Sequence, residues 1–337
     1  MFRWKRKWIS ALTAAVLAAG TVCGCGSSRG GEEVNDGKVR VVATIFPQYD
    51  FVREIAGDCV DVRMLLKPGE ETHSYEPTPQ DIIAIQNCDI FLYVGGENDA
   101  WVEDILESMP DPDRKTLKLV DCVDTVEEEH VEGMKESPGH EHEEEEEHGE
   151  HEEEEASSHS VHEIDEHVWT SPVNAESIVN NICELLCETD PENGEMYREN
   201  AEEYTEELRQ LDSEFREIVE KADSRLLIFG DRFPFRYFAD EYDLDYYAAF
   251  PGCASDTEPS AATMAFLINK AKEEHTAAVL KMELSNENIA KAVAEAAGTD
   301  VRVFYSCHNL SAEQFAAGEN YLSMMRKNAE TLREVLN

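Results

Sequence analysis

The fold is decided by residues 39–66, which read VRVVATIFPQYDFVREIAGDCVDVRMLL. Val39–Ile45 has the composition of a buried strand, Gln48–Ala56 is amphipathic, and Val60–Leu66 alternates between apolar and polar residues as a strand does. Strands that alternate with helices are typical of parallel βαβ units. This stretch therefore predicts an α/β fold built on a parallel sheet.

The same alternation extends to about residue 126 and returns in the last third of the chain. After the opening unit we expect a helix over Pro79–Asn87 with Thr78 as its N-cap, a strand over Asp89–Val94 and a helix over Asp99–Ser108. The last third has strands over 225–230, 277–282 and 301–305, and helices over 260–274, 286–297 and 319–336. Ligands of open parallel sheets bind beyond the carboxyl ends of the strands, so two such lobes predict a cleft between them.

Two helical segments separate the lobes. Ser171 caps and Pro172 opens a helix that runs to about Glu188, and a longer helix covers 191–222. Roughly thirty residues at 1.5 Å each give a rod of about 45 Å, long enough to join two lobes. Its apolar stripe follows three-and-four spacing and comprises Tyr197, Tyr204, Leu208, Leu211, Phe215 and Ile218. We expect an N-terminal βα lobe over 39–190, a linking helix over 191–222 and a C-terminal βα lobe over 223–337.

The N-terminus has the features of an export signal. A basic segment precedes a short apolar run, Ile9–Ala19, which is too short to span a membrane. The run ends in Val22-Cys23-Gly24-Cys25, which resembles a bacterial lipobox with Cys25 as the lipidated residue. We expect a lipoprotein signal peptide over 1–25 and a flexible tether over 26–38. A cleaved secretory signal with an incidental cysteine pair is the alternative.

The charge of the chain excludes one class of partner and favours another. The 337 residues include 29 Lys and Arg and 73 Asp and Glu, a formal net charge of −44. A nucleic-acid-binding protein needs a basic face, so this balance argues against nucleic acid and suits cations. Residues 127–166 are rich in Glu, His and Ser and predict a disordered loop that interacts weakly with metal ions, or simply a solubilising acidic loop.

Three histidines stand at the expected edge of the cleft. His73 follows the strand over 60–66 by a short loop, His167 precedes the helix that opens at Pro172, and His308 follows the strand over 301–305. Each could be an ordinary loop or helix-entry histidine when taken alone. Neutral imidazole suits Zn²⁺, so together they predict a zinc site. Asp231 and Glu283 also end strands, and each is a candidate fourth ligand, a hydrogen-bond acceptor that fixes the tautomer of a ligand imidazole, or a salt-bridge partner.

Two phrases around these histidines carry a family resemblance. The segment from Pro68 to Pro79 reads PGEETHSYEPTP, and that from Asp165 to Ala175 reads DEHVWTSPVNA. The chain resembles the metal-binding substrate-binding proteins of ABC transporters, specifically their zinc-uptake branch, in which a charged, His-rich loop precedes the second phrase. The resemblance implies two βα lobes joined by a long rigid helix, with one metal between them.

The resemblance also implies a ligand set. The first two family ligands fall on His73 and His167, and the last falls on His308. Arg232 stands where the family commonly has His or Glu, and a guanidinium cannot ligate a metal. The fourth position is therefore left to water or to a carboxylate such as Asp231 or Glu283.

We expect a membrane-tethered, monomeric receptor that captures Zn²⁺ and delivers it to an ABC transporter permease, and not an enzyme. The alternatives are a manganese receptor of the same family and a surface adhesin in which the metal is structural. A zinc hydrolase is a further rival, although the chain has no His-Glu-x-x-His phrase.

Overall fold

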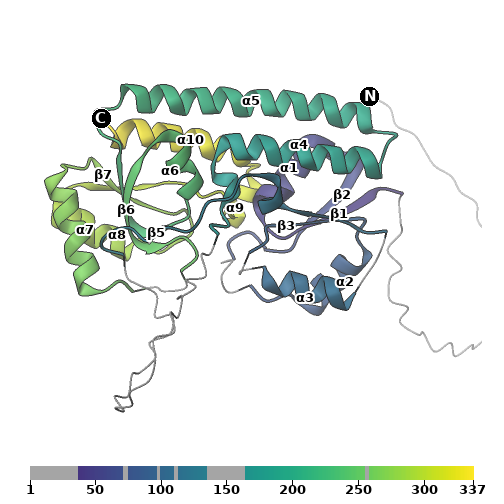
Figure 1. Ribbon diagram of the computed structural model, residues 1–337, viewed down its shortest axis with the longest axis horizontal. Coiled ribbons are helices and arrows are strands. Elements are labelled where there is room, and N and C mark those ends of the chain that lie inside the picture. The colour runs from purple at the N-terminus through teal and green to yellow at the C-terminus, as the bar shows by residue number, and fades with distance from the viewer. Residues whose placement is uncertain (1–36, 71–74, 97–98, 110–112, 135–163, 255–257) are drawn as a thin grey trace, which may run out of the picture. The chain divides into compact units, whose positions relative to one another are not determined.

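The computed structural model describes residues 37–70, 75–96, 99–109, 113–134, 164–254 and 258–337 (Figure 1). Four predicted features lie outside these residues: the signal peptide with Cys25, almost all of the tether, His73, and residues 135–163 of the acidic loop. Residues 38–337 belong to one compact unit, which is described below.

The first lobe contains a four-stranded, all-parallel sheet with the strand order β2-β1-β3-β4. Its strands are β1 (Val39–Ala43), β2 (Val60–Met64), β3 (Ile90–Tyr93) and β4 (Lys115–Lys118). Its helices are α1 (Phe46–Ala56), α2 (Pro79–Asn87), α3 (Ala100–Ser108) and α4 (Pro172–Thr189). Thr78 caps α2 and Ser171 caps α4 through their side chains, which confirms both predicted helix starts.

The second lobe repeats this plan with the strand order β6-β5-β7-β8, again all parallel. Its strands are β5 (Leu226–Phe233), β6 (Asp245–Pro251), β7 (Ala278–Lys281) and β8 (Asp300–Val303). Its helices are α6 (Arg236–Tyr242), α7 (Ala261–Glu273), α8 (Asn288–Ala297), α9 (Ala312–Ala316) and α10 (Tyr321–Val335). The prediction of two βα lobes with parallel sheets is confirmed, although the sequence patterns missed β4, β6, α6 and α9.

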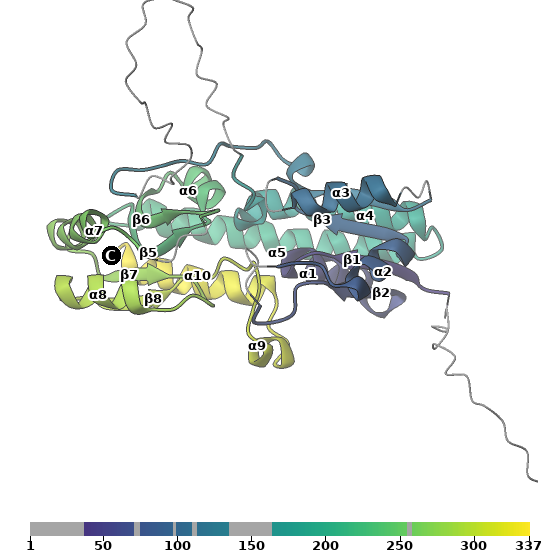
Figure 2. The ribbon, with the colours of Figure 1, turned by 90° about the horizontal axis from the view of Figure 1, so that it is seen from below.

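Helix α5 (Gly194–Lys221) runs along both lobes (Figures 1 and 2). It contacts α1 and α4 in the first lobe and α6 and α10 in the second. Every residue of its predicted apolar stripe is buried. Phe51 of α1 packs against Tyr204 with ring centroids 6.0 Å apart, and Phe238 of α6 packs against Phe215 at 4.9 Å. The helix therefore joins the lobes through packed aromatic side chains.

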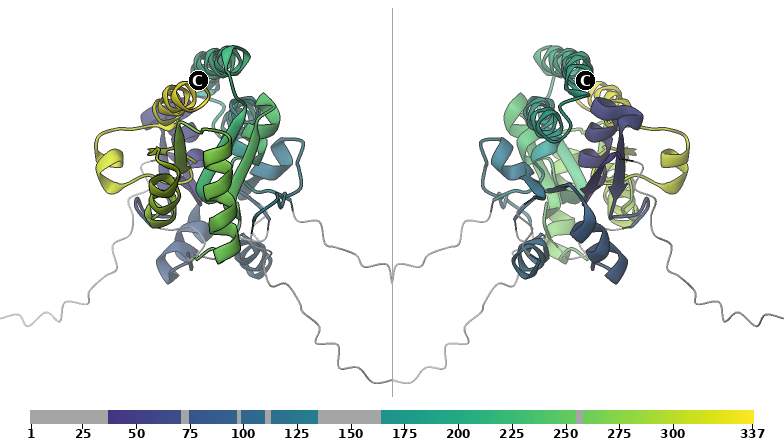
Figure 3. Two further views of the ribbon diagram at one scale, coloured as in Figure 1. Left: turned by 90° about the vertical axis from the view of Figure 1, so that its left-hand side faces the viewer. Right: turned by 90° about the vertical axis from the view of Figure 1, so that its right-hand side faces the viewer.

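In each lobe, the two faces of the sheet pack against different parts of the protein. Val41 and Ala43 of β1, with Phe229 and Leu280 of the second sheet, belong to one hydrophobic core that continues through both lobes. The opposite faces pack against α2 and α3 in the first lobe and against α7 and α8 in the second, as the end views show for the second lobe (Figure 3). Because the lobes share a core, a rigid-body rotation of one against the other would expose apolar surface.

The ends of the predicted disordered loop, 127–166, are ordered. Glu127 forms an antiparallel bridge with Ile164, and the Asp165 amide donates to the Val126 carbonyl at 2.9 Å. The Glu128 carboxylate accepts a hydrogen bond from the Cys253 amide at 2.8 Å. The prediction is wrong for 127–134 and 164–166, because side-chain and main-chain contacts with the rest of the protein hold these acidic residues.

The seven cysteines that the structure describes are free, and Cys183 and Cys187 of α4 are buried. No helix within the described ranges is long and apolar enough to cross a membrane.

Candidate metal centre

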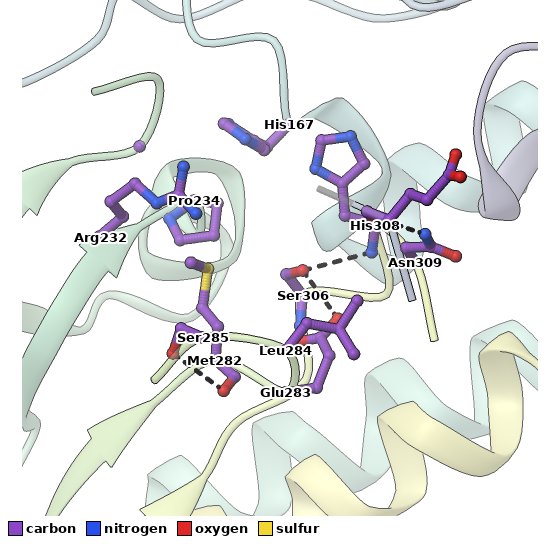
Figure 4. Close-up of a pocket in the computed structure, with 12 residues that line it drawn as sticks. His167, Arg232, Pro234, Met282, Glu283, Leu284, Ser285, Ser306, His308 and Asn309 are labelled. Carbon is purple, nitrogen blue, oxygen red and sulfur yellow. Dashed lines mark hydrogen bonds between the residues drawn. The ribbon is translucent and has the colours of Figure 1, made fainter. Parts of the chain in front are cut away.

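A cavity of about 40 Å³ lies between the lobes, at the carboxyl ends of β5, β7 and β8 (Figure 4). His167 reaches it from the segment before α4, and His308 reaches it from the loop after β8. The other lining residues are Glu70, Arg232, Pro234, Gly252, Met282, Glu283, Leu284, Ser285, Ser306 and Asn309. Parallel strands commonly place ligand sites at this edge, because the loops that follow them converge there.

His167 is buried and its ring is oriented by Asp165. Oδ1 of Asp165 accepts hydrogen bonds from the main-chain amide of His167 at 2.8 Å and from its ring Nδ1 at 3.0 Å. With the proton on Nδ1, the lone pair of Nε2 is available to a metal ion, the arrangement found in carboxylate–histidine–metal triads. The sequence alone did not show this role of Asp165, because a two-residue spacing does not reveal which nitrogen the carboxylate contacts.

The charges around His167 change its affinity for protons. Burial lowers the pKa of the imidazole, but the attraction and hydrogen bond of Asp165, together with the nearby Glu166 and Glu128, outweigh this effect and raise the pKa above its usual value. A site that stabilises an added proton on this ring also stabilises an added cation. The electrostatics therefore favour a metal ion.

His308 faces His167 across the cavity. The ring centroids of the two histidines are 5.8 Å apart, and Trp169 packs edge-on against His308 at 5.0 Å. Two imidazoles that bind one zinc ion at 2.0–2.1 Å with tetrahedral angles would have centroids roughly 5 Å apart. The indole Nε1 of Trp169 donates to the Ser306 carbonyl at 2.9 Å and so ties the two histidine-bearing segments together.

The segment that leads to His73 is anchored beside His308. The side-chain amide of Asn309 donates to the carbonyl oxygens of Lys67 and Glu70 at 2.8 and 2.9 Å. The Gly69 amide donates to the Leu310 carbonyl at 2.8 Å. His73 itself lies outside the described residues, but the segment that ends three positions before it borders the cavity.

The two candidate carboxylates have other partners. Oε2 of Glu283 accepts a hydrogen bond from the Ser306 amide at 2.8 Å, and Oε1 accepts one from the Ser306 hydroxyl at 2.9 Å. Burial raises the pKa of Glu283 to about 7, an effect that hydrogen bonds from the loop partly offset. Glu283 therefore supports the loop that carries His308.

Asp231 does not line the cavity. Its carboxylate accepts hydrogen bonds from the amides of Arg232 and Met282, both at 2.9 Å, and from the Ser285 hydroxyl. It holds the ends of β5 and β7 together, a role that depends on contacts 51 and 54 positions away and that local sequence could not reveal. Within the described ranges, which exclude His73, no group of three or more His, Cys, Asp or Glu residues is placed to hold a metal ion.

Comparisons with known proteins agree with this architecture. Residues 41–335 match the family described as "Zinc-uptake complex component A periplasmic". The chain is 33% identical to the high-affinity zinc uptake system protein ZnuA of Bacillus subtilis, over 99% of this chain and 98% of that protein. It is 32% identical to the zinc-binding lipoprotein AdcA of Streptococcus pneumoniae, over 89% of this chain and 56% of that longer protein. The crystal structure of the Zn(II)-bound ZnuA-like domain of AdcA superposes with a TM-score of 0.69 at 29% identity, covering 89% of this chain and 99% of that domain.

Proposed function

Because the chain belongs to the family of periplasmic zinc-uptake components, we propose that it captures Zn²⁺ outside the cytoplasm and delivers it to the permease of an ABC transporter. The family that the phrases around His73 and His167 indicated is thereby confirmed. Proteins of this family are substrate-binding receptors and not enzymes, so the hydrolase alternative is set aside.

The observation that carries the proposal is the pairing of His167 with His308 across the cavity. One ring comes from each lobe, the centroids are 5.8 Å apart, and Asp165 accepts a hydrogen bond from Nδ1 of His167. In the proposed site these two rings and His73 bind one zinc ion. Three imidazoles favour Zn²⁺ over Mn²⁺, which usually takes more oxygen ligands.

The proposed receptor is a monomer held at the membrane by a lipid on Cys25. The tether over 26–38 would let the folded unit reach the permease while the anchor keeps it at the surface. The shared core and α5 oppose large rotations of the lobes, so metal loading would shift loops at the cavity more than it shifts the lobes. The permease would then recognise the positions of these loops.

The site assignment can be tested by titrating zinc into the purified protein and into His73→Ala, His167→Ala and His308→Ala. A chelator of known affinity, present in competition, isolates the tightest site. Each variant should lose at least about tenfold in zinc affinity, because each removes one of three ligands. His130→Ala is the matched control, since His130 is exposed and does not line the cavity. Unchanged affinity in all three ligand variants would refute the site.

The same titration with Mn²⁺ separates the zinc receptor from the manganese alternative. The adhesin alternative is separated by growth of the host cell in zinc-depleted medium. A receptor predicts that deletion of the gene slows growth and that added zinc restores it, whereas an adhesin with a structural metal predicts no growth defect.

A further inference from the structure

Two free cysteines lie side by side on α4. Cys183 and Cys187 are four residues apart, so both thiols fall on one face of the helix, where α4 packs against α5 (Figure 1). Both thiols line a groove of about 760 Å³ between these two helices. The charged residues that line the groove are Glu184, Glu188, Arg198 and Glu202. The groove shares no lining residue with the cavity that holds the histidines, so it is a separate feature of the protein.

The two thiols interact with each other and with the start of α5. The thiol of Cys187 donates a hydrogen bond to the Gly194 carbonyl at 3.4 Å. Burial raises the pKa of Cys183 to about 12, and the charge and hydrogen bonding of the adjacent Cys187 sulfur add to this effect. Cys183 therefore carries its proton at neutral pH and is not a reactive nucleophile. Both sulfurs are within reach of a single ligand in the groove.

The spacing of the two cysteines is unfavourable for a disulfide and suits a bridging ion. Cβ atoms four residues apart on a helix are separated by roughly 5–6 Å. A disulfide needs a separation of about 3.5–4.5 Å, so closing one would distort α4, which is helical throughout Pro172–Thr189. An ion bound by two thiolates at about 2.3 Å each holds the sulfurs up to about 4.6 Å apart. Two side chains on an undistorted helix can span that separation.

We propose that Cys183 and Cys187 bind one soft monovalent cation of the Cu⁺ class, at a site independent of the histidine cavity. Thiolates are the soft ligands that select Cu⁺. Within the described residues, no third His, Cys, Asp or Glu is placed with the two thiols to hold a metal ion. Cu⁺ forms stable linear complexes with two thiolates, whereas structural Zn²⁺ sites take about four protein ligands. The number of ligands therefore favours Cu⁺ over Zn²⁺ in this groove.

The charges around the groove are compatible with the bound ion. Binding replaces two thiol protons by one Cu⁺, so the product carries one negative charge. Arg198 lines the groove and partly offsets the effect of burial on the neighbouring thiol pKa, so it also favours this anionic product. Glu188 pairs with Lys115 at 2.8 Å, and Glu202 pairs with Arg209 at 3.3 Å. Two of the three lining glutamates are thus balanced by cations.

The test uses the purified full chain carrying Cys23→Ser and Cys25→Ser, so that the two N-terminal thiols do not contribute. The protein is first loaded with one equivalent of Zn²⁺. It is then titrated with Cu⁺ without oxygen, in competition with bathocuproine disulfonate, a chelator of Cu⁺. We expect one tightly bound Cu⁺ per chain, an ultraviolet charge-transfer band from thiolate to copper, and no release of the bound zinc.

Two conservative variants locate the site. Cys183→Ser and Cys187→Ser keep the size of the side chain but replace a soft sulfur by a hard oxygen, so each should abolish the charge-transfer band and the tight binding of copper. Cys122→Ser is the matched control, because Cys122 is a free thiol outside the groove and should leave both unchanged. All three variants should keep the zinc affinity of the parent protein, which shows that they fold.

Three results would overturn the proposal. The first is the absence of the band in the parent protein, and the second is a band of parental strength in both groove variants. The third is release of one zinc ion for each copper bound, because copper would then occupy the histidine cavity. None of these results affects the zinc receptor, since its site is tested separately by the histidine variants.

Discussion

The side-chain amide of Asn309 donates a hydrogen bond to the main-chain carbonyl of Glu70 at 2.9 Å, across 239 positions of the chain. Asn309 follows His308 directly, and Glu70 stands three residues before His73. This contact therefore joins the segments that carry two of the three proposed ligands. Asn309 is buried, and its amide donates to the Lys67 carbonyl as well.

Asn309→Ala should weaken zinc binding without touching a ligand. Loss of the two hydrogen bonds should lower the free energy of unfolding by about 1–3 kcal/mol, because buried carbonyls lose their partner. We expect zinc affinity to fall roughly tenfold as the segment before His73 loses its anchor. Chelator competition and denaturant unfolding measure the two effects. Asn181→Ala removes one hydrogen bond within α4 and should leave zinc affinity unchanged; equal zinc affinities in both variants would show that the anchor is unimportant.

Asp165→Asn should weaken zinc binding through His167. Removing the carboxylate charge lowers the basicity of the ring and loosens its orientation, and such changes typically cost 10- to 100-fold in metal affinity. Zinc titrations at pH 8, where protons compete little for the ring, measure this loss. Asp61→Asn, at an exposed position of β2, is the control. Wild-type affinity in Asp165→Asn would mean that Asp165 does not orient the ligand.

The same variant should change the pH dependence of zinc binding. Asp165 helps to hold the pKa of His167 above its usual value, so in the wild-type protein protons begin to compete with zinc at a higher pH than for an ordinary histidine. In Asp165→Asn the pKa of His167 falls, and the pH at which zinc affinity starts to drop should fall with it. A shift toward higher pH would contradict this electrostatic account.

Asp50→Asn should make the stability of the metal-free protein less sensitive to rising pH. Burial raises the pKa of Asp50 from 3.8 to about 7, and a hydrogen bond from the Tyr321 amide offsets part of this effect. Between about pH 4 and pH 7 the folded protein retains a proton that the unfolded chain releases, so stability is lost as the pH rises through this window. A shift of about 3 units corresponds to about 4 kcal/mol at most.

Urea unfolding of the metal-free protein between pH 5.5 and pH 8 should show this effect. The stability of Asp50→Asn relative to the wild-type protein should increase from pH 5.5 to about pH 7 and then level off, because the asparagine oxygen can still accept from Tyr321 and carries no charge to bury. Asp58→Asn, an exposed carboxylate nearby in the chain, should give a constant difference. If the difference in stability between Asp50→Asn and the wild-type protein is also constant with pH, Asp50 does not titrate in this window.

Removal of the His- and Glu-rich tract should leave the tight site intact. Residues 135–163 contain six of the chain's 11 histidines and can be replaced by a Gly-Ser linker. The replacement must spare 127–134, because Glu128 contacts Cys253 and Glu129 contacts Tyr246 and Arg236. We expect calorimetry to show that one zinc ion per protein still binds tightly and that the weaker zinc binding is lost. Loss of the tight equivalent would place that site in the tract.

Local patterns predicted most of the first sheet, the capped starts of α2 and α4, and the apolar stripe of α5. These features depend on neighbours within a few residues, where periodicity and capping chemistry are decisive. The missed strands show the limit of this information. β4 has only four residues, with lysines at both ends, and β6 follows a short unpredicted helix, so neither has a long periodic signal.

The sequence by itself determined the α/β class, the family, and the placement of His167 and His308 at the edge of a cleft. Only the tertiary structure decided how the surrounding groups act: Asp165 orients His167, Glu283 and Asp231 support loops, and Arg232 enters the cavity. The physical reason is distance along the chain. The supporting hydrogen bonds of Asn309, Trp169 and Asp231 join residues between 51 and 242 positions apart, and only the packing of two sheets against one shared core brings them together.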